Sequence, residues 1–206
     1  MKIRLVLAGM VLLAVTFPGC SSMPKVNRVS ADTQVDLSGR WNDTDVRQVC
    51  NSLIRDCLNN TSVTSYIDQF STRYGRQPAV IVGAFKNNSS EHIDTSIISR
   101  SMEIAIVNSG KLDFVAGGDT RTELRTERDD QQMNASEATT SSLSNETGAN
   151  FMLTGTVNMI EDRAGNTTVR SYFVSAELTN IETNRRLWMG ENNEIKKVIT
   201  RPRVRL

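Results

Sequence analysis

Histidine is nearly absent from this 206-residue chain, and its scarcity excludes several kinds of chemistry. The only histidine is His92, which lies in a polar stretch. A serine or cysteine hydrolase of the usual type needs a histidine base. A zinc site needs several histidine or cysteine ligands close together. The sequence therefore predicts neither a hydrolase triad nor a bound metal.

Aromatic residues and unbalanced charge are also scarce. Phe, Trp and Tyr make up 5% of the chain, and the formal net charge is +1. Nucleic-acid-binding surfaces usually combine a basic patch with interleaved aromatic residues. The phosphate-binding patterns GxxxxGK and GxGxxG are missing as well, and Gly117-Gly118 lacks the third glycine. We predict no nucleic-acid partner, no cofactor and no small-molecule substrate.

Two carboxylate pairs remain as candidates for acid–base catalysis. They are Glu91 with Asp94, and Glu161 with Asp162. Each pair also has a structural interpretation, as a solvated loop or a helix cap. We favour the structural interpretation and predict that the protein is not an enzyme.

The amino terminus has the form of a secretory signal. Two basic residues precede an apolar run, residues 5–17, which is too short to cross a bilayer comfortably. Gly19-Cys20 follows and resembles the lipobox of bacterial lipoproteins, with Phe17 where that family prefers leucine. The resemblance implies cleavage between Gly19 and Cys20, diacylglycerol on the thiol, and a fatty acid such as palmitate on the new amino terminus. The alternative is an ordinary secreted protein with an unrelated cysteine.

The residue after the cysteine indicates which membrane would hold the protein. Ser21 stands where an aspartate would suggest retention at the inner membrane, so we expect a lipid anchor at the periplasmic face of the outer membrane. Several acyl chains, at about 0.8 kcal/mol per buried methylene, would make that attachment permanent. The predicted organisation is a signal peptide (1–19), lipidated cysteine with a short polar tether (20–36), globular domain (37–199) and basic tail (200–206). We expect the basic residues near the carboxyl end to be solvated, with contact to anionic lipid or glycan as the alternative: Lys196, Lys197, Arg201, Arg203 and Arg205.

Helical periodicity predicts a first helix that begins at Asn42 or Asp43. Cys50 and Cys57 lie on its apolar face, about 10.5 Å apart along the helix axis, which is too far for a disulfide. We predict two buried, reduced thiols. Without the signal peptide the net charge falls from +1 to −1, which suits one near-neutral domain.

Four further helical segments are expected. One covers residues 63–74, with Tyr66, Ile67 and Phe70 inward, and ends at Gly75. A second is capped by Asp94, ends at Gly110, and directs these apolar residues toward the sheet: Ile97, Ile98, Met102, Ile104, Ala105 and Val107. Residues 119–132 predict an exposed helix or arm, and residues 136–147 a weak helix closed by Gly148.

The strands complete an α+β fold. Residues 78–85 predict a buried central strand, and residues 114–116 a short one. A long hairpin is expected from 151–161 and 167–181 around a turn at 163–166, with a further strand near Trp188. On its second arm four alternate residues should be buried: Tyr172, Val174, Ala176 and Leu178. The predicted class is α+β, similar to a three-layer α/β fold, with a mixed, mainly antiparallel sheet covered by helices.

Five segments carry a resemblance to a known family. They are LSGRWNDTD (37–45), AVIVGAFKNNSSEHID (79–94), GKLDFV (110–115), GANFMLTGTV (148–157) and VSAELTNIETNRRLWMGE (174–191). With the lipobox and the polar tether, they resemble the penicillin-binding protein activator LpoB family. The resemblance covers nearly all of the chain after the signal and implies a domain similar to the N-terminal domain of the translocation protein TolB.

The resemblance implies a non-enzymatic outer-membrane lipoprotein that binds a bifunctional class A penicillin-binding protein and stimulates peptidoglycan synthesis. It specifies no partner-binding residue. Family members carry a long proline-rich tether, whereas residues 21–35 contain only Pro24 and reach at most about 50 Å. The alternative is a structural or assembly lipoprotein of an outer-membrane secretion system, similar to the curli secretion lipoprotein. The predicted hairpin is too polar near its tip for the lipid-facing strands of that family's pore.

Overall fold

The computed structural model describes residues 26–30, 33–141 and 146–202. Two compact units divide the chain, Met1–Thr33 and Gln34–Leu206. In the first unit the described residues form no helix or strand. The predicted signal peptide and lipidation site, including Gly19 and Cys20, lie outside the described residues. None of the helices in the described ranges is long and apolar enough to cross a membrane.

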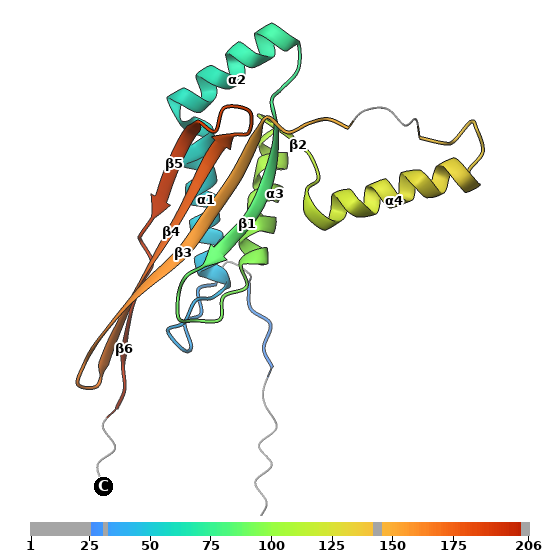
Figure 1. Cartoon of the computed structure of the whole chain (residues 1–206). Helices are drawn as coiled ribbons and strands as arrows, with labels where there is room; N and C mark the ends of the chain where they lie inside the picture. Colours follow the sequence, from blue (N-terminus) through green and yellow to red (C-terminus); the bar gives the residue numbers. More distant parts are fainter. Residues whose placement is uncertain (1–25, 31–32, 142–145, 203–206) are drawn as a thin grey trace, which may run out of the picture. The chain divides into compact units, whose positions relative to one another are not determined.

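The second unit is built on a mixed six-stranded sheet (Figure 1). Strands run in the order β2-β1-β3-β4-β5, and β6 pairs with β4 beyond the end of β5. Strand β1 is parallel to β2 and β3, and the other pairings are antiparallel. The strand bounds are β1 Ala79–Asn87, β2 Asp113–Phe114, β3 Phe151–Ala164, β4 Thr167–Asn180, β5 Arg186–Asn192 and β6 Lys196–Thr200. The predicted α+β class and the mainly antiparallel sheet are confirmed.

The helices begin and end where capping chemistry places them. They are α1 Asp43–Asn59, α2 Thr61–Tyr74, α3 Thr95–Ser109 and α4 Gly118–Asn134. A capping box joins Asn42 to Asp45 at the start of α1, and Asp94 caps α3. Gly75 and Gly110 end α2 and α3 with φ values of 66° and 62°, a left-handed conformation that favours glycine. The start of α1, the end of α2 and both ends of α3 were predicted from the sequence and are confirmed, whereas α2 begins two residues earlier than predicted, at Thr61.

The core lies between the sheet and helices α1 and α3, which are side by side in Figure 1. Alternate residues of β4 enter this core as predicted, and Tyr172 is fully buried. Cys50 and Cys57 are buried in α1 as free thiols, as predicted. Burial raises the pKa of the two thiols to about 11 and about 12 respectively. Both side chains therefore contribute apolar packing rather than reactivity.

Helix α3 buries fewer residues than the sequence predicted. Its fully enclosed side chains are Ile98, Met102 and Ile106. Ile97, Ile104 and Val107 were expected to face the sheet, but each is more than half exposed. A straight helix presents only one stripe to a flat sheet, so apolar residues around its whole circumference cannot all be buried. The prediction that these three side chains face the sheet was therefore wrong.

Helix α4 makes no contact with another helix or strand in the described part of the chain. None of its residues is buried, which confirms the predicted exposed helix. Glu146 holds the following segment against it through ion pairs with Arg125 (2.9 Å) and Arg128 (2.7 Å). The weak helix predicted at 136–147 is wrong in its described residues, which contain only a turn near 137–139. There the hydroxyls of Thr139 and Thr140 donate to the backbone carbonyl of Ser136 and compete with a helix.

Candidate binding site beside helix α2

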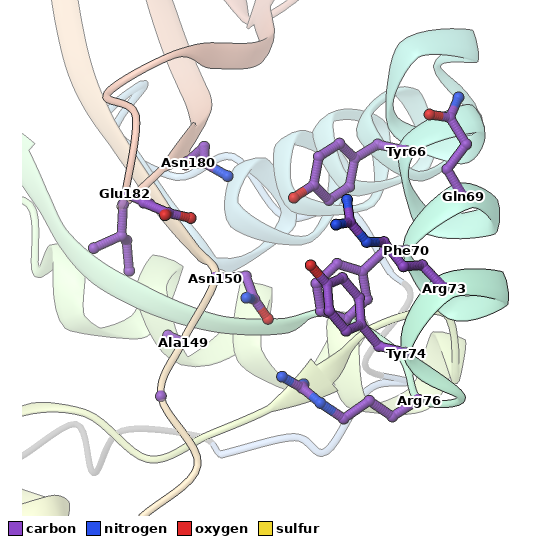
Figure 2. A pocket seen from close by; sticks show the side chains of 12 residues that line it. Tyr66, Gln69, Phe70, Arg73, Tyr74, Arg76, Ala149, Asn150, Asn180 and Glu182 are labelled. Atoms are coloured by element: carbon purple, nitrogen blue, oxygen red, sulfur yellow. The ribbon is translucent and has the colours of Figure 1, made fainter.

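A pocket of about 580 Å³ lies between helix α2 and two segments at the end of the sheet. On α2, the side chains of Val63, Ile67 and Phe70 turn toward the core. The side chains next to them on the helix surface, three or four residues apart, therefore face the pocket. The opposite wall comes from the entry to β3 and from the turn between β4 and β5. The lining residues are Tyr66, Gln69, Phe70, Arg73, Tyr74, Arg76, Gly148, Ala149, Asn150, Asn180, Ile181 and Glu182 (Figure 2).

Aromatic rings form the floor and one side of the pocket. Tyr66 meets the ring of buried Phe151 edge-on, with centroids 4.9 Å apart. The rings of Phe70 and Tyr74 are 4.5 Å apart and tilted by 43°. Tyr74 remains 54% exposed, so this wall offers an apolar surface to a ligand at the rim. Such ring pairs hold the rings in place and stabilise the fold beyond the contribution of their buried apolar area.

Two arginines stand over these rings. The guanidinium carbon of Arg73 lies 5.3 Å from the Tyr74 ring centroid, and that of Arg76 lies 5.1 Å from the Phe70 centroid. Arg76 also donates to the backbone carbonyl of Gln77 at 3.2 Å. Neither arginine pairs with a carboxylate in the described ranges. Cation–π contacts therefore position both charges without neutralising them.

The opposite wall is held by hydrogen bonds that cross between strands. Asn150 exchanges two bonds with Ala79, donating from its backbone N–H (2.7 Å) and accepting at its side chain (2.8 Å). Ile181 donates to the Asn150 carbonyl at 3.0 Å. The Asn180 side chain accepts from both the backbone and the hydroxyl of Thr183. These bonds fix the backbone of this wall, and the Glu182 carboxylate, which lines the pocket, has no hydrogen-bond or ion-pair partner among the residues that the structure describes.

This pocket was not predicted from the sequence. Its residues come from three segments, 66–76, 148–150 and 180–182, that only the folded chain brings together. The one local signal is the group of Tyr66, Phe70, Arg73 and Tyr74 at helical spacing along α2, at the border between its buried and exposed sides. The chemistry suits binding of an anionic ligand with an apolar portion.

The two carboxylates of the first candidate catalytic pair, Glu91 and Asp94, have different partners in the structure. Asp94 caps α3 by accepting from the hydroxyl and the backbone N–H of Ser96, and these bonds, the hydroxyl first, lower the pKa of Asp94. Glu91 instead accepts from the Tyr172 hydroxyl (2.9 Å) and from the backbone of Trp41 (3.1 Å). Burial, and then Glu91, raise the pKa of Tyr172 well above its usual range.

Arg170 joins Glu91 to Glu161. Its Nη1 lies 3.0 Å from Glu91 Oε1, an ion pair without the alignment of a hydrogen bond, and its Nε donates to Glu161 at 2.7 Å. This bond lowers the pKa of Glu161. Arg170 also donates to the Gly39 carbonyl at 3.3 Å. The cluster pins the start of the domain to the hairpin, which is a structural role.

A second buried cluster corrects the prediction for the basic carboxyl end. Lys196 is exposed as expected, but the Lys197 side chain is only 10% exposed. Its ammonium lies 2.6 Å from Asp45 and 2.7 Å from Asp36, and it donates to the Arg40 carbonyl at 2.8 Å. Strand β6, which the sequence analysis did not predict, places Lys197 opposite Arg170 and so directs it inward. Lys197 is therefore a structural cation rather than part of a solvated tail.

Metal ligands do not gather in the described ranges, where no group of three or more His, Cys, Asp or Glu residues is found. His92 is exposed. The fold and the pocket together define a domain of the α+β class with a ligand-sized cavity beside α2.

The family model described as peptidoglycan-synthase activator LpoB matches residues 45–194. The chain belongs to this family. A comparison with curated proteins gives no significant match.

Solved structures are similar at low identity. The C-terminal domain of LpoB from Salmonella enterica aligns at 15% identity and a TM-score of 0.43, covering 76% of this chain and 99% of that one. The same domain from Escherichia coli aligns at 13% identity and a TM-score of 0.45, with the same coverage. The lipoprotein GNA1162 from Neisseria meningitidis aligns at 16% identity and a TM-score of 0.39, covering 62% and 88%.

Proposed function

We propose that this protein binds a bifunctional class A penicillin-binding protein and stimulates its synthesis of peptidoglycan. The observation that carries the proposal is membership of the peptidoglycan-synthase activator family over residues 45–194. An activator acts by binding the active conformation of the synthase more tightly than the inactive one. A preorganised binding domain suits that role, because little ordering free energy is then lost on association.

We further propose that Cys20 carries the lipid and holds the domain at the periplasmic face of the outer membrane. Residues 20–36 would then form the tether and residues 37–199 the activating domain. A tether of this length makes reach limiting for a synthase in the inner membrane. An insert of about 20 Gly/Ser residues would add roughly 25 Å of root-mean-square reach, at an entropic cost under about 1 kcal/mol.

The test is envelope cross-linking in cells, followed by capture of this protein and identification of what is bound. Recovery of a class A penicillin-binding protein supports the proposal, and recovery of secretion components supports the assembly alternative. Strains with the insert, or with residues 25–32 deleted, give the functional arm. Stimulation of cross-linking should hold or rise with the longer tether and fall with the deletion. No synthase adduct at any tether length, together with indifference to the deletion, would overturn the proposal.

A further inference from the structure

Charges of opposite sign face each other across the pocket beside α2. Arg73 lies in the last turn of α2, Arg76 follows the Gly75 cap of that helix, and Glu182 lies in the turn between β4 and β5 (Figure 2). None of the three forms an ion pair within residues 26–30, 33–141 and 146–202. Elsewhere on this domain arginines do find carboxylates, as Arg125 and Arg128 do at Glu146. The pocket is thus a place where complementary charge is available to a ligand.

The positions of these charges are set before binding. Aromatic rings support both guanidinium groups at 5.3 and 5.1 Å. A hydrogen bond between the segments of Ala79 and Asn150, and a turn bond from Thr183 to the Asn180 side chain, hold the other wall. A volume of about 580 Å³ falls within the range of about 300–1,000 Å³ that is typical of small-molecule sites. A single guanidinium group can donate two parallel hydrogen bonds to one carboxylate, which makes the recognition directional.

We propose that this pocket binds the peptide stem of peptidoglycan, with its free carboxylates on Arg73 and Arg76 and its free amino group toward Glu182. The choice of peptidoglycan rests on the proposed function, because a synthase activator works beside this polymer. The stem peptide carries carboxylates and an ammonium group on a short chain, whereas a chain of N-acetylglucosamine carries neither a free amine nor a carboxylate. Its aliphatic portions would pack on the exposed ring of Tyr74.

The experiment is calorimetric titration of the full-length protein in mild detergent. The probe is the tetrapeptide N-acetyl-L-Ala-γ-D-Glu-meso-diaminopimelate-D-Ala, whose only free amine is that of diaminopimelate. Two comparison ligands are the same peptide with its carboxylates amidated and a trimer of N-acetylglucosamine. We expect saturable binding of the tetrapeptide, at least about tenfold weaker binding of the amidated form, and none of the sugar. Equal binding of the amidated peptide, binding of the sugar alone, or no saturable binding of the tetrapeptide overturns the proposal.

Variants locate the binding. The double change Arg73→Gln and Arg76→Gln should weaken tetrapeptide binding at least about tenfold. The matched control, Arg55→Gln with Arg100→Gln, removes the same charge from exposed sites and should leave binding unchanged. Glu182→Gln should weaken binding of the tetrapeptide but not of a version acetylated at the diaminopimelate amine. A control variant as weak as the pocket variant would show a general charge effect and refute the site.

Synthase stimulation is measured separately, so that the two proposals can fail independently. A protein that stimulates the synthase but binds no tetrapeptide refutes the pocket assignment and retains the proposed function. A protein that binds the tetrapeptide but stimulates no synthase supports the pocket and refutes the proposed function. If an acidic segment of the synthase binds at Arg73 and Arg76 and the tetrapeptide does not, that result also refutes the assignment of the pocket to the stem peptide.

Discussion

Replacing Lys197 by methionine is the most direct test of how the carboxyl end is integrated into the domain. Methionine keeps the unbranched apolar stem and removes the ammonium group. Asp45, whose side chain is 6% exposed, then loses its cation 2.6 Å away. Asp36 loses the same partner but is 33% exposed, so water can replace much of that contact. The consequence is an uncompensated charge at Asp45.

The structure sets the size of the effect. Removing one partner of a buried ion pair costs about 3–5 kcal/mol. Asp45 keeps its hydrogen bond from the backbone of Asn42 at 2.9 Å, so we expect the lower end, about 3 kcal/mol. For a domain of about 150–250 residues, each kcal/mol lowers the melting temperature by about 2–4 °C. Lys197→Met should therefore melt about 6–12 °C below the natural protein.

The pH dependence identifies the cause. Burial raises the pKa of Asp45 above its ordinary value, although Lys197 opposes the shift. A raised carboxyl pKa means that the protonated form is favoured on folding, so its contribution is lost as the pH rises through that pKa. Without Lys197, the charged form of Asp45 destabilises the folded state further, because the cation that opposes the effect of burial is gone. The deficit of Lys197→Met should be largest at neutral pH and shrink as acid protonates Asp45.

The bond from Lys197 lowers the pKa of Asp36, so Asp36 contributes in the opposite direction. Its stabilisation is present above the ordinary carboxyl range and is lost as the pH falls through the lowered pKa. Loss of the Asp36 contact therefore also appears chiefly at neutral pH, and both carboxylates predict a smaller deficit in acid.

The assay is urea denaturation of the detergent-solubilised protein at neutral and at acidic pH. Lys196→Met is the matched control, because Lys196 is next to Lys197 in the chain but its side chain is exposed. Adding Asp45→Asn to Lys197→Met should recover part of the loss, since asparagine keeps the acceptor for Asn42 without the charge. A Lys197→Met loss no larger than that of Lys196→Met, or one that does not change with pH, would refute the reasoning.

Three further predictions are independent of this cluster. Cys50 and Cys57 should resist a thiol reagent at pH 8 in the folded protein and react on denaturation, because burial raises their pKa to about 11 and about 12; a disulfide found by non-reducing mass measurement would contradict this. Gly155→Ala should cost about 1–3 kcal/mol in urea denaturation, because its new methyl group would overlap a buried phenylalanine ring and the backbone of β4, whereas Gly148→Ala has no neighbour within 4 Å and should change little. Cys20→Ala should move the protein from the membrane to the soluble periplasmic fraction and abolish palmitate labelling; persistence of both would exclude lipidation at this residue.

Some features of this fold are written in short stretches of sequence. The apolar residues of α1 recur at helical spacing, so the burial of Cys50 and Cys57 on one face followed from that spacing. Asp94 and Gly110 mark the ends of α3 through local capping bonds. The alternation along β4 identified its buried face. Each of these signals depends on residues a few positions apart, where backbone geometry alone decides which side chains share a face.

Other features were decided by contacts between distant segments. Lys197 lies beside Asp45, 152 positions earlier in the chain, and no local pattern distinguishes it from exposed Lys196. The exposed side of α3 depends on where the sheet lies, and the α2 pocket on three separate segments. The sequence by itself determined the four helices, strands β1 to β5 and the buried faces of α1 and β4, but it did not predict β6 or the exposed side of α3. The tertiary structure decided which charges are buried and where a ligand can bind, because both depend on the desolvation and alignment that only the packed chain provides.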